Sequence, residues 1–412
     1  MLFRFSLYGF LKNQTYFEPF LILAFREKGL SFFQIGLLIG FREVCVNLLE
    51  IPSGAVADIY GRRRAMIFSF SAYIASFLIF GFAGSLAALF GAVLAFALGE
   101  AFRSGTHKAM IFDWLRGQGR EGERTRFYGF TRSWSKMGSA LAVAISAGFI
   151  FSGASYSDVF LLAVIPYLLG IVNFLGYPAG LDGRRGEGAG IAAVLGHLKG
   201  ALRHTFRLPP LRRIVCESMG FGGTYKAAKD YIQPVIQQAA LGLVLLAAWE
   251  EHKRVALLVG SVYFVLHILS SVASRGGYRL SAAAGGEERA ARLIWAGTSV
   301  LYAGLAAGLW MGHESVVIAA FIGLAVAQNF WRPILISRID AHGSPEAGAT
   351  VLSIEAQAKS LFAMMLAPAL GFAVDRLGLV PVGVAGFLVA APFALGGFFW
   401  AGAKGREAGA SP

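Results

Sequence analysis

Two short stretches of the chain place a polar side chain beside a proline in otherwise apolar surroundings. In "TYFEPF", residues 15–20, Glu18 precedes a proline, and "DYIQPV", residues 230–235, repeats the pattern with Gln233. Proline removes a backbone donor and weakens a helix locally. A carboxyl group held in apolar surroundings can bind and release a proton near neutral pH, whereas an amide cannot. The two stretches predict an ionisable site at Glu18 beside a flexible point.

Many further ionisable residues lie in equally apolar segments. An ionised side chain at the centre of a membrane costs about 2.5–3.5 kcal/mol on insertion scales, so it faces a partner or a water-filled cavity. These residues are Lys12, Arg42, Glu43, Glu50, Glu100, Arg103, Lys108, Arg132, Lys136, Lys226, Lys229, Asp230, Arg332, Glu355 and Lys359. Glu100, Arg103 and His107 share one helix face at spacings of three and four. The set predicts a polar cavity or a network of ion pairs.

The composition indicates a polytopic helical membrane protein. The chain has 412 residues, of which 56% are hydrophobic and 15% charged, and soluble domains carry about 25% charged residues. The net charge of +13 comes from basic residues in short loops, which predicts a membrane topology signal and no nucleic-acid binding. Cys45 and Cys216 lie apart in apolar runs and form no metal-ligand pattern. We expect no metal and no cofactor.

Apolar runs set the number of spans, and loop charges set their orientation. A crossing helix needs about 20 mostly apolar residues, which predicts about twelve spans in this chain. With the N-terminus inside, the inside loops hold the basic runs at 61–64, 115–126, 178–213 and 275–292. The outside loops hold only Arg26, Lys28, Lys253, Arg254 and Arg376. Basic loops favour the cytoplasm, so both termini are predicted to be cytoplasmic, with the first span an uncleaved anchor in the cell membrane, the inner membrane in a bacterium.

The second half of the chain repeats a pattern of residues found in the first half. Tyr16, Pro19 and Arg103 have counterparts in Tyr231, Pro234 and Arg332. This predicts a duplicated six-helix unit, which is one known plan for transporters. The predicted organisation is an N-terminal bundle over 1–178, a linker over 179–212 and a C-terminal bundle over 213–412. Apolar residues at helical spacing in the linker, with basic residues opposite, predict an amphipathic helix on the cytoplasmic leaflet.

The stretch "GAVADIYGRRRAM", residues 54–66, resembles the signature loop of the major facilitator superfamily. The matching positions are Gly54, Asp58, Gly61, Arg62 and Arg63. Ile59 departs, because the family usually has a basic residue there. The resemblance implies an all-α membrane protein with twelve transmembrane helices in two pseudo-symmetric six-helix bundles, working as a monomer. It also implies that the loop is a conformational latch, in which Asp58 accepts from arginines or a helix end and Gly54 lets two helices approach closely.

Family architecture assigns roles to the intramembrane residues. In the family, spans one, four, seven and ten line the central cavity, and two, five, eight and eleven form the interface. The resemblance therefore implies a substrate site with candidates Tyr16, Glu18, Arg103, Lys226, Lys229 and Arg332. The proton-coupling candidates are Glu18, Glu100 and Asp230. Glu43 would face Lys359 if spans two and eleven touch, as a gate.

These residues indicate a secondary active transporter that works by alternating access, with protons or another ion as the coupling partner. Basic residues outnumber acidic ones among the cavity candidates, which favours a small anionic or zwitterionic solute, and aromatic residues would suit an amphipathic one. Two interpretations of Glu18 stay open, a proton carrier or an ion-pair partner of Arg103 or Lys229. Import and efflux are equally compatible. The alternatives are a receptor of similar fold that binds without transport, and a membrane enzyme, for which no catalytic motif is present.

Overall fold

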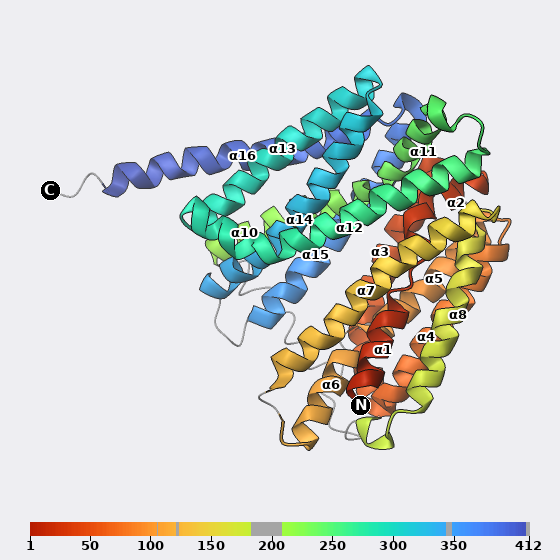
Figure 1. Ribbon diagram of the computed structural model, residues 1–412. Helices are drawn as coiled ribbons and strands as arrows, with labels where there is room; N and C mark the ends of the chain where they lie inside the picture. The colour runs from red at the N-terminus through yellow and green to blue at the C-terminus, as the bar shows by residue number, and fades with distance from the viewer. Residues whose placement is uncertain (105, 121–122, 183–207, 343–347, 409–412) are drawn as a thin grey trace. The chain divides into compact units, whose positions relative to one another are not determined.

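The computed structural model describes residues 1–104, 106–120, 123–182, 208–342 and 348–408, and every regular element in these ranges is a helix. Figure 1 shows the helices in order along the chain. The elements up to residue 182 are α1 (Leu2–Lys12), η1 (Glu18–Phe20), α2 (Leu21–Glu27), α3 (Phe32–Tyr60), α4 (Arg62–Phe82), α5 (Leu86–Arg103), α6 (Thr106–Gly117), α7 (Arg124–Phe151), α8 (Asp158–Leu175) and η3 (Ala179–Asp182).

The elements from residue 208 onward are also helical. They are α10 (Pro209–Ala228), η4 (Lys229–Tyr231), α11 (Ile232–Gly242), η5 (Val244–Leu246), α12 (Glu251–Ala284), α13 (Glu287–Met311), α14 (Glu314–His342), α15 (Gly348–Leu377) and α16 (Val380–Ala408). Among the described residues, nine helices are long and apolar enough to cross a membrane. A multi-pass helical membrane protein is therefore confirmed, and the number of twelve spans stays a prediction.

Helices are interrupted at both proline stretches. The first helix ends at Lys12, and the chain resumes as the 3-10 turn η1, which carries Pro19, before α2 begins. In the second stretch η4 follows α10, and Pro234 lies in the first turn of α11. A proline in the first turn of a helix breaks no intrahelical hydrogen bond, because the N–H groups there have no helical partner. Each proline therefore marks the start of a new helical segment and not a kink within one.

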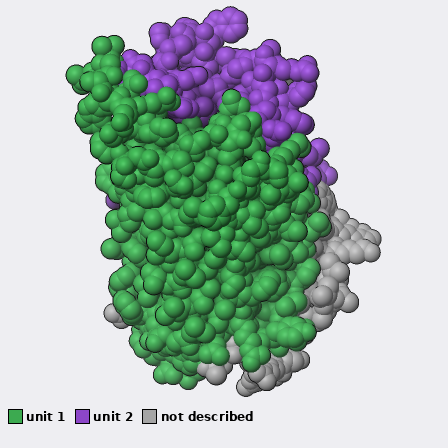
Figure 2. Space-filling view, turned by 90° about the vertical axis from the view of Figure 1, so that its right-hand side faces the viewer, with its two compact units in different colours: residues 1–30, 37–197, 244–264 green, residues 31–36, 198–243, 265–412 purple. Residues whose placement is uncertain are grey.

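The chain forms two compact units, whose residues are coloured separately in Figure 2. The first unit comprises Met1–Leu30, Leu37–His197 and Val244–Phe264, and the second Ser31–Gly36, Leu198–Leu243 and Val265–Pro412. Two of the boundaries, after Gly36 and after Phe264, fall inside α3 and α12. The predicted domain limits stay predictions, and residues 183–207 of the predicted linker helix lie outside the described residues.

Within the first unit, α4 packs against α5 and α8, and α1 packs against α7 and α8 (Figure 1). Glycines let α1 and α7 meet backbone to backbone. A methyl group at Gly138 of α7 would lie 2.5 Å from the carbonyl oxygen of Phe10, and one at Gly9 of α1 would lie 3.0 Å from that of Thr131. Small residues allow such close approach between membrane helices. This contact fixes the register of the two helices that carry most of the site described below.

Within the second unit, α13 packs against α14 and α16, while α10 packs against α14, α15 and α16. Aromatic residues fill the space between these helices. Trp331 of α14 stacks on Phe221 of α10 with ring centroids 4.7 Å apart, and Trp295 of α13 stacks on Phe393 of α16 at 4.6 Å. Because the packed faces are apolar, the charged residues on the same helices must find partners in small local clusters.

Candidate functional site

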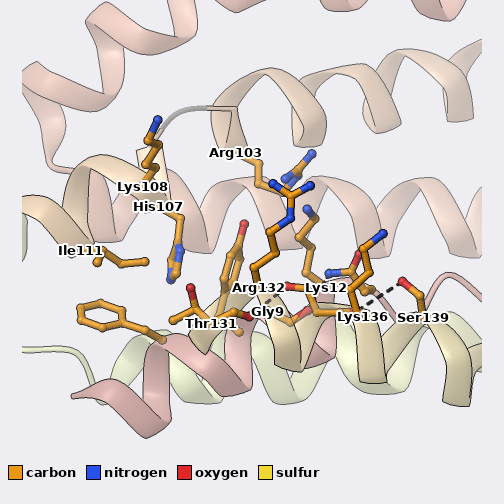
Figure 3. A pocket seen from close by; sticks show the side chains of 14 residues that line it. Gly9, Lys12, Arg103, His107, Lys108, Ile111, Thr131, Arg132, Lys136 and Ser139 are labelled. Atoms are coloured by element: carbon orange, nitrogen blue, oxygen red, sulfur yellow. Dashed lines mark hydrogen bonds between the residues drawn. The ribbon is translucent and has the colours of Figure 1, made fainter. Parts of the chain in front are cut away.

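A polar cavity of about 420 Å³ lies within the first unit. Its walls come from α1, the end of α5, α6 and α7, and Figure 3 shows the side chains that line it. They are Phe5, Tyr8, Gly9, Lys12, Asn13, Arg103, His107, Lys108, Ile111, Thr131, Arg132, Ser135, Lys136 and Ser139. Among these described residues five are cations at neutral pH and none is a carboxylate. The arrangement therefore suits a negatively charged ligand.

Arg103, at the last position of α5, is a lining cation with a carboxylate beside it. Its guanidinium forms an ion pair with Glu100 one turn earlier, and its Nε donates to the Tyr73 hydroxyl at 3.3 Å. Tyr73 in turn donates its hydroxyl hydrogen to Glu100. The three side chains orient one another, so Arg103 is held in place with its charge largely compensated.

Lys12, Arg132 and Lys136 form a second group, which we call the cation triad. Among the described residues, none of the three has a carboxylate oxygen within 4.0 Å. Arg132 and Lys136 are exposed and lie one turn apart on α7, at a spacing where like charges repel. Lys12 ends α1, where the helix carbonyls favour a cation. Its charge is repelled by that of Arg103 and attracted by that of Glu100. Figure 3 shows the triad on one side of the cavity.

His107 and Tyr8 form the other side of the cavity. Their rings stack with centroids 3.7 Å apart, and Phe5 meets His107 edge-on at 5.6 Å. The His107 Nε2 atom lies 3.3 Å from the hydroxyl oxygen of Tyr177. The Tyr177 hydroxyl also lies 3.2 Å from the carbonyl oxygen of Arg4. These contacts hold the His107 ring in place along this side of the cavity.

The predicted site residues of the first unit fall in and beside this cavity. Arg103 lines the cavity, and Glu100 forms an ion pair with Arg103 without lining the cavity itself. Tyr16 is buried in the turn before η1, outside the lining residues. Glu18 is exposed at the start of η1, accepts from Thr15 Oγ1 at 3.2 Å, and attracts Lys136 electrostatically. The structure thus brings Arg103 and Glu100 together and places Glu18 close to the cation triad.

The predicted residues of the second unit form contacts in three separate places. The Lys226 ammonium donates to Ser360 Oγ at 3.2 Å, and Lys229 pairs with its neighbour Asp230 at 2.9 Å. Arg332 and Lys359 both pair with Glu355, at 3.0 and 2.8 Å.

Glu355 is fully buried on α15 and also accepts a hydrogen bond from Ser218 of α10. Lys359, predicted as a gate residue, therefore has Glu355 as an observed partner. Glu43 is buried on α3 and accepts from Arg42 at 3.0 Å. The Glu43–Lys359 gate stays a prediction.

The signature loop joins α3 to α4. Gly61 has φ +104°, a left-handed conformation that favours glycine, and α4 starts directly after it. Arg62 pairs with Asp113 of α6, and Arg63 donates to the Tyr177 carbonyl at 3.0 Å. The Asp58 side chain lies outside the described residues. A methyl group at Gly54 would meet no described atom within 4 Å, so the close helix approach expected there is absent from the described part of the chain.

Several residues of the clusters were absent from the predicted site. Lys12, Arg132, Lys136 and Glu355 were recognised as intramembrane charges, and the spacing of four between Arg132 and Lys136 was the available signal that they share a face. No motif or spacing in the sequence indicated a role for Arg338, a residue of α14 that is only 2% exposed. Its guanidinium binds Glu217 of α10 at 2.7 Å and both carboxylate oxygens of Glu288 of α13, at 2.7 and 3.1 Å.

A helical membrane protein with a polar, cation-lined cavity among its spans has the features of a solute transporter. Comparison with known proteins agrees, because a model of the Major Facilitator Superfamily matches residues 13–356. The chain belongs to the major facilitator superfamily and is a membrane transporter of that type, which indicates transport and not enzymatic catalysis. An uncharacterized transporter of this type from Bacillus subtilis strain 168, YxaM, is 31% identical over 159 residues. The match covers 39% of this chain and 37% of that protein.

Solved structures share the fold. A mutant of the nucleoside transporter NupG superposes with a TM-score of 0.77 at 12% identity, over 97% of this chain and 99% of that chain. A mutant of the peptide transporter POT superposes with a TM-score of 0.70 at 14% identity, over 96% of this chain and 93% of that one. At these identities the likeness concerns the fold alone, and it confirms the predicted transporter fold.

Proposed function

We propose that the chain is a secondary active transporter that carries a small organic anion across the cell membrane by alternating access. The observation that supports this is the excess of cations in the cavity of the first unit, where Lys12, Arg132 and Lys136 have no carboxylate partner among the described residues. Like charges that gather in one cavity repel one another unless a counter-charge or water compensates them. A bound anion would be that counter-charge, and its arrival and departure would change the balance of charge in the site.

We further propose that protons are the coupling ion. Each unit charge moved through a potential of 100 mV costs or gains about 2.3 kcal/mol, so protons that travel with an anion offset its electrical work. Glu18 is the first candidate among the three predicted carboxylates, because it is exposed. Glu100 and Asp230 are less exposed and form ion pairs with Arg103 and Lys229.

The remaining site assignments are proposals of the same kind. Tyr16, Arg103, Lys226, Lys229 and Arg332 would contribute to substrate binding at successive steps. The signature-loop residues would act as the cytoplasmic latch. The transporter would be a monomer in the cell membrane with both termini in the cytoplasm.

Flux into proteoliposomes tests the transport proposal. The full chain would be reconstituted, a pH gradient of either sign imposed, and the vesicle content assayed by mass spectrometry after addition of phenyl phosphate, phenyl sulfate, propane-1,2,3-tricarboxylate or uridine. Uridine serves as a neutral solute, since a structural neighbour is a nucleoside transporter. We expect protein-dependent accumulation of at least one anion, stimulated by one sign of the gradient, and its loss in the variant Arg132→Gln/Lys136→Gln.

The matched control is Lys253→Gln, which removes a cation from an exposed pair with Glu250 at the start of α12. This variant should transport as the natural chain does. Protein-dependent uptake of uridine alone would overturn the anion assignment. Absence of flux for all four solutes under both gradients would overturn the transport proposal.

A further inference from the structure

The cations in the cavity of the first unit differ from many other cations of the described chain in whether a carboxylate lies beside them. Many cations elsewhere on the spanning helices sit beside carboxylates. The described pairs are Arg42–Glu43, Arg62–Asp113, Arg103–Glu100, Lys229–Asp230, Arg332–Glu355, Lys359–Glu355 and Arg338–Glu217. Three cations without such a partner, Lys12, Arg132 and Lys136, gather in one cavity.

We infer that the anion received by this cavity is multiply charged, with at least two negative charges at one end of a small organic body. This rests on the proposed function and names its substrate class. A single negative charge would leave most of the triad uncompensated, and the two like charges on α7 would continue to repel. A dianion or trianion would neutralise the group. Phosphate monoesters and di- or tricarboxylates are the small molecules with this charge.

The neutral polar groups of the cavity reinforce the role of the triad. Ser135 donates its hydroxyl hydrogen to the Thr131 carbonyl at 3.3 Å, and Ser139 donates to the Ser135 carbonyl at 3.2 Å. Asn13 donates its amide hydrogen to the Gly9 carbonyl at 2.6 Å. These bonds direct one hydrogen of each of these three groups to a backbone oxygen, which leaves the ammonium and guanidinium groups as the main donors for an anion.

The geometry of the donors fits oxyanion groups. The planar guanidinium of Arg132 matches two oxygens of one carboxylate or phosphate, whereas Lys12 and Lys136 act as point charges that satisfy the remaining oxygens. Figure 3 shows His107 and Ile111 on the side of the cavity away from the triad. The Tyr8 ring, which also lines the cavity, stacks on His107, so this side is flat and mostly apolar. The cavity of about 420 Å³ has room for a metabolite-sized body between this wall and the triad.

Phenyl sulfate and phenyl phosphate provide a matched pair of probes, because they have nearly the same shape. The sulfate carries one negative charge, and the phosphate carries about two above its second pKa of about 6. Binding to the full chain in chloride buffer at pH 7.5 would be measured by calorimetry. We expect phenyl phosphate to bind about tenfold more tightly or better, because its second charge meets a second cation of the triad. At pH 5, where the phosphate is a monoanion, the two probes should bind alike.

Single variants connect the preference to the triad. Arg132→Gln and Lys136→Gln should each reduce the preference for phenyl phosphate, whereas Lys136→Arg, which keeps the charge, should preserve it, and so should the outlying control Lys253→Gln. Removing one of two repelling cations should not impair folding, and thermal unfolding of the two glutamine variants in detergent checks this directly. Equal affinities for the two probes in the natural chain, or a preference unchanged in both glutamine variants, would overturn the inference.

Flux separates this inference from the transport proposal. Transport of phenyl sulfate and phenyl phosphate at equal rates and affinities would overturn the multiple-charge inference and leave the transporter intact. Tight, charge-selective binding of phenyl phosphate without any flux would support the inference and overturn transport.

Discussion

At the scale of single residues, the described cations divide into those that are structural and those that are available to a ligand. Arg338 is fixed by carboxylates and serves the packing of its helix. Lys12, Arg132 and Lys136 have no such partner in the described residues and face a cavity. The distinction predicts different consequences of substitution. Loss of a structural charge should lower stability, and loss of an available charge should alter binding.

Glu355→Gln should lower stability. Glu355 is fully buried and compensates both Arg332 and Lys359. Removing one partner of a buried ion pair costs about 3–5 kcal/mol, and we expect about 3 because the Arg332 side chain is 45% exposed. The measurement is thermal unfolding in detergent. Glu250→Gln, the same change in a largely exposed pair, should shift the unfolding temperature little. Equal shifts in the two variants would contradict the structural role.

Glu18→Gln should uncouple transport from the proton gradient. The amide cannot bind a proton, and it keeps the size of the side chain at the start of η1. We expect anion exchange at equal pH to persist while accumulation driven by a pH gradient is lost. The control is again Glu250→Gln. Undiminished gradient-driven accumulation in Glu18→Gln would assign Glu18 to ion pairing and not to proton transfer.

At the scale of elements, interrupted helices and close helix contacts place the site. Lys12 and Arg103 occupy the last positions of α1 and α5, where helix carbonyls favour cations. The close contact of α1 with α7 then brings Lys12 to the cavity that Arg132 and Lys136 also line. Discontinuous helices near the substrate are a recurrent feature of transporters. The position of the triad therefore depends on two helix ends and one glycine contact.

Gly138→Ala should separate α1 from α7. The added methyl group would lie 2.5 Å from the carbonyl oxygen of Phe10, and relieving such overpacking costs about 1–3 kcal/mol. We expect a lower unfolding temperature together with weaker anion binding. Gly148→Ala is the control on the same helix, because its methyl group would meet no described atom within 4 Å. Alanine is the better helix former, so this control should be neutral or stabilising by up to about 1 kcal/mol. A harmless Gly138→Ala would refute the close contact.

Arg338→Lys should weaken the junction of α14 with α10 and α13. One ammonium cannot bind Glu217 and both oxygens of Glu288 as the guanidinium does. We expect a loss of about 2–4 kcal/mol in unfolding free energy, because carboxylates are left without a full partner. Arg213→Lys alters a more exposed cation of the same cluster and should cost less than about 1 kcal/mol. If both variants lost the same stability, the bidentate contact would not be the reason.

At the scale of the whole molecule, the family, the helical membrane fold and the two proline interruptions could be predicted from the sequence, because each depends on local composition or on a contiguous motif. The ion-pair partners of individual charged residues could not be predicted. Glu355 was recognisable as an intramembrane carboxylate, but its contacts with Ser218 and Arg332 depend on how α10, α14 and α15 are rotated about their axes. A single sequence contains no direct record of such rotations.

The predicted topology can be tested by labelling. In a background with Cys45→Ala and Cys216→Ala, we would place single cysteines by Gln118→Cys, after α6, and Ala247→Cys, before α12; both positions are exposed. Loop charges predict that a membrane-impermeant maleimide labels position 247 in intact cells and position 118 only after permeabilisation. A reversed pattern would place the termini outside.

The cation triad also bears on how the protein is handled in the laboratory. Concentrated positive charge in a solvent-accessible hollow attracts whatever small oxyanion the solution supplies. Citrate, sulfate and phosphate buffers would then behave as inhibitors that protect the purified protein against heat while masking its true ligand. Extraction and screening in chloride salts of uncharged buffers would keep the hollow open to weaker binders.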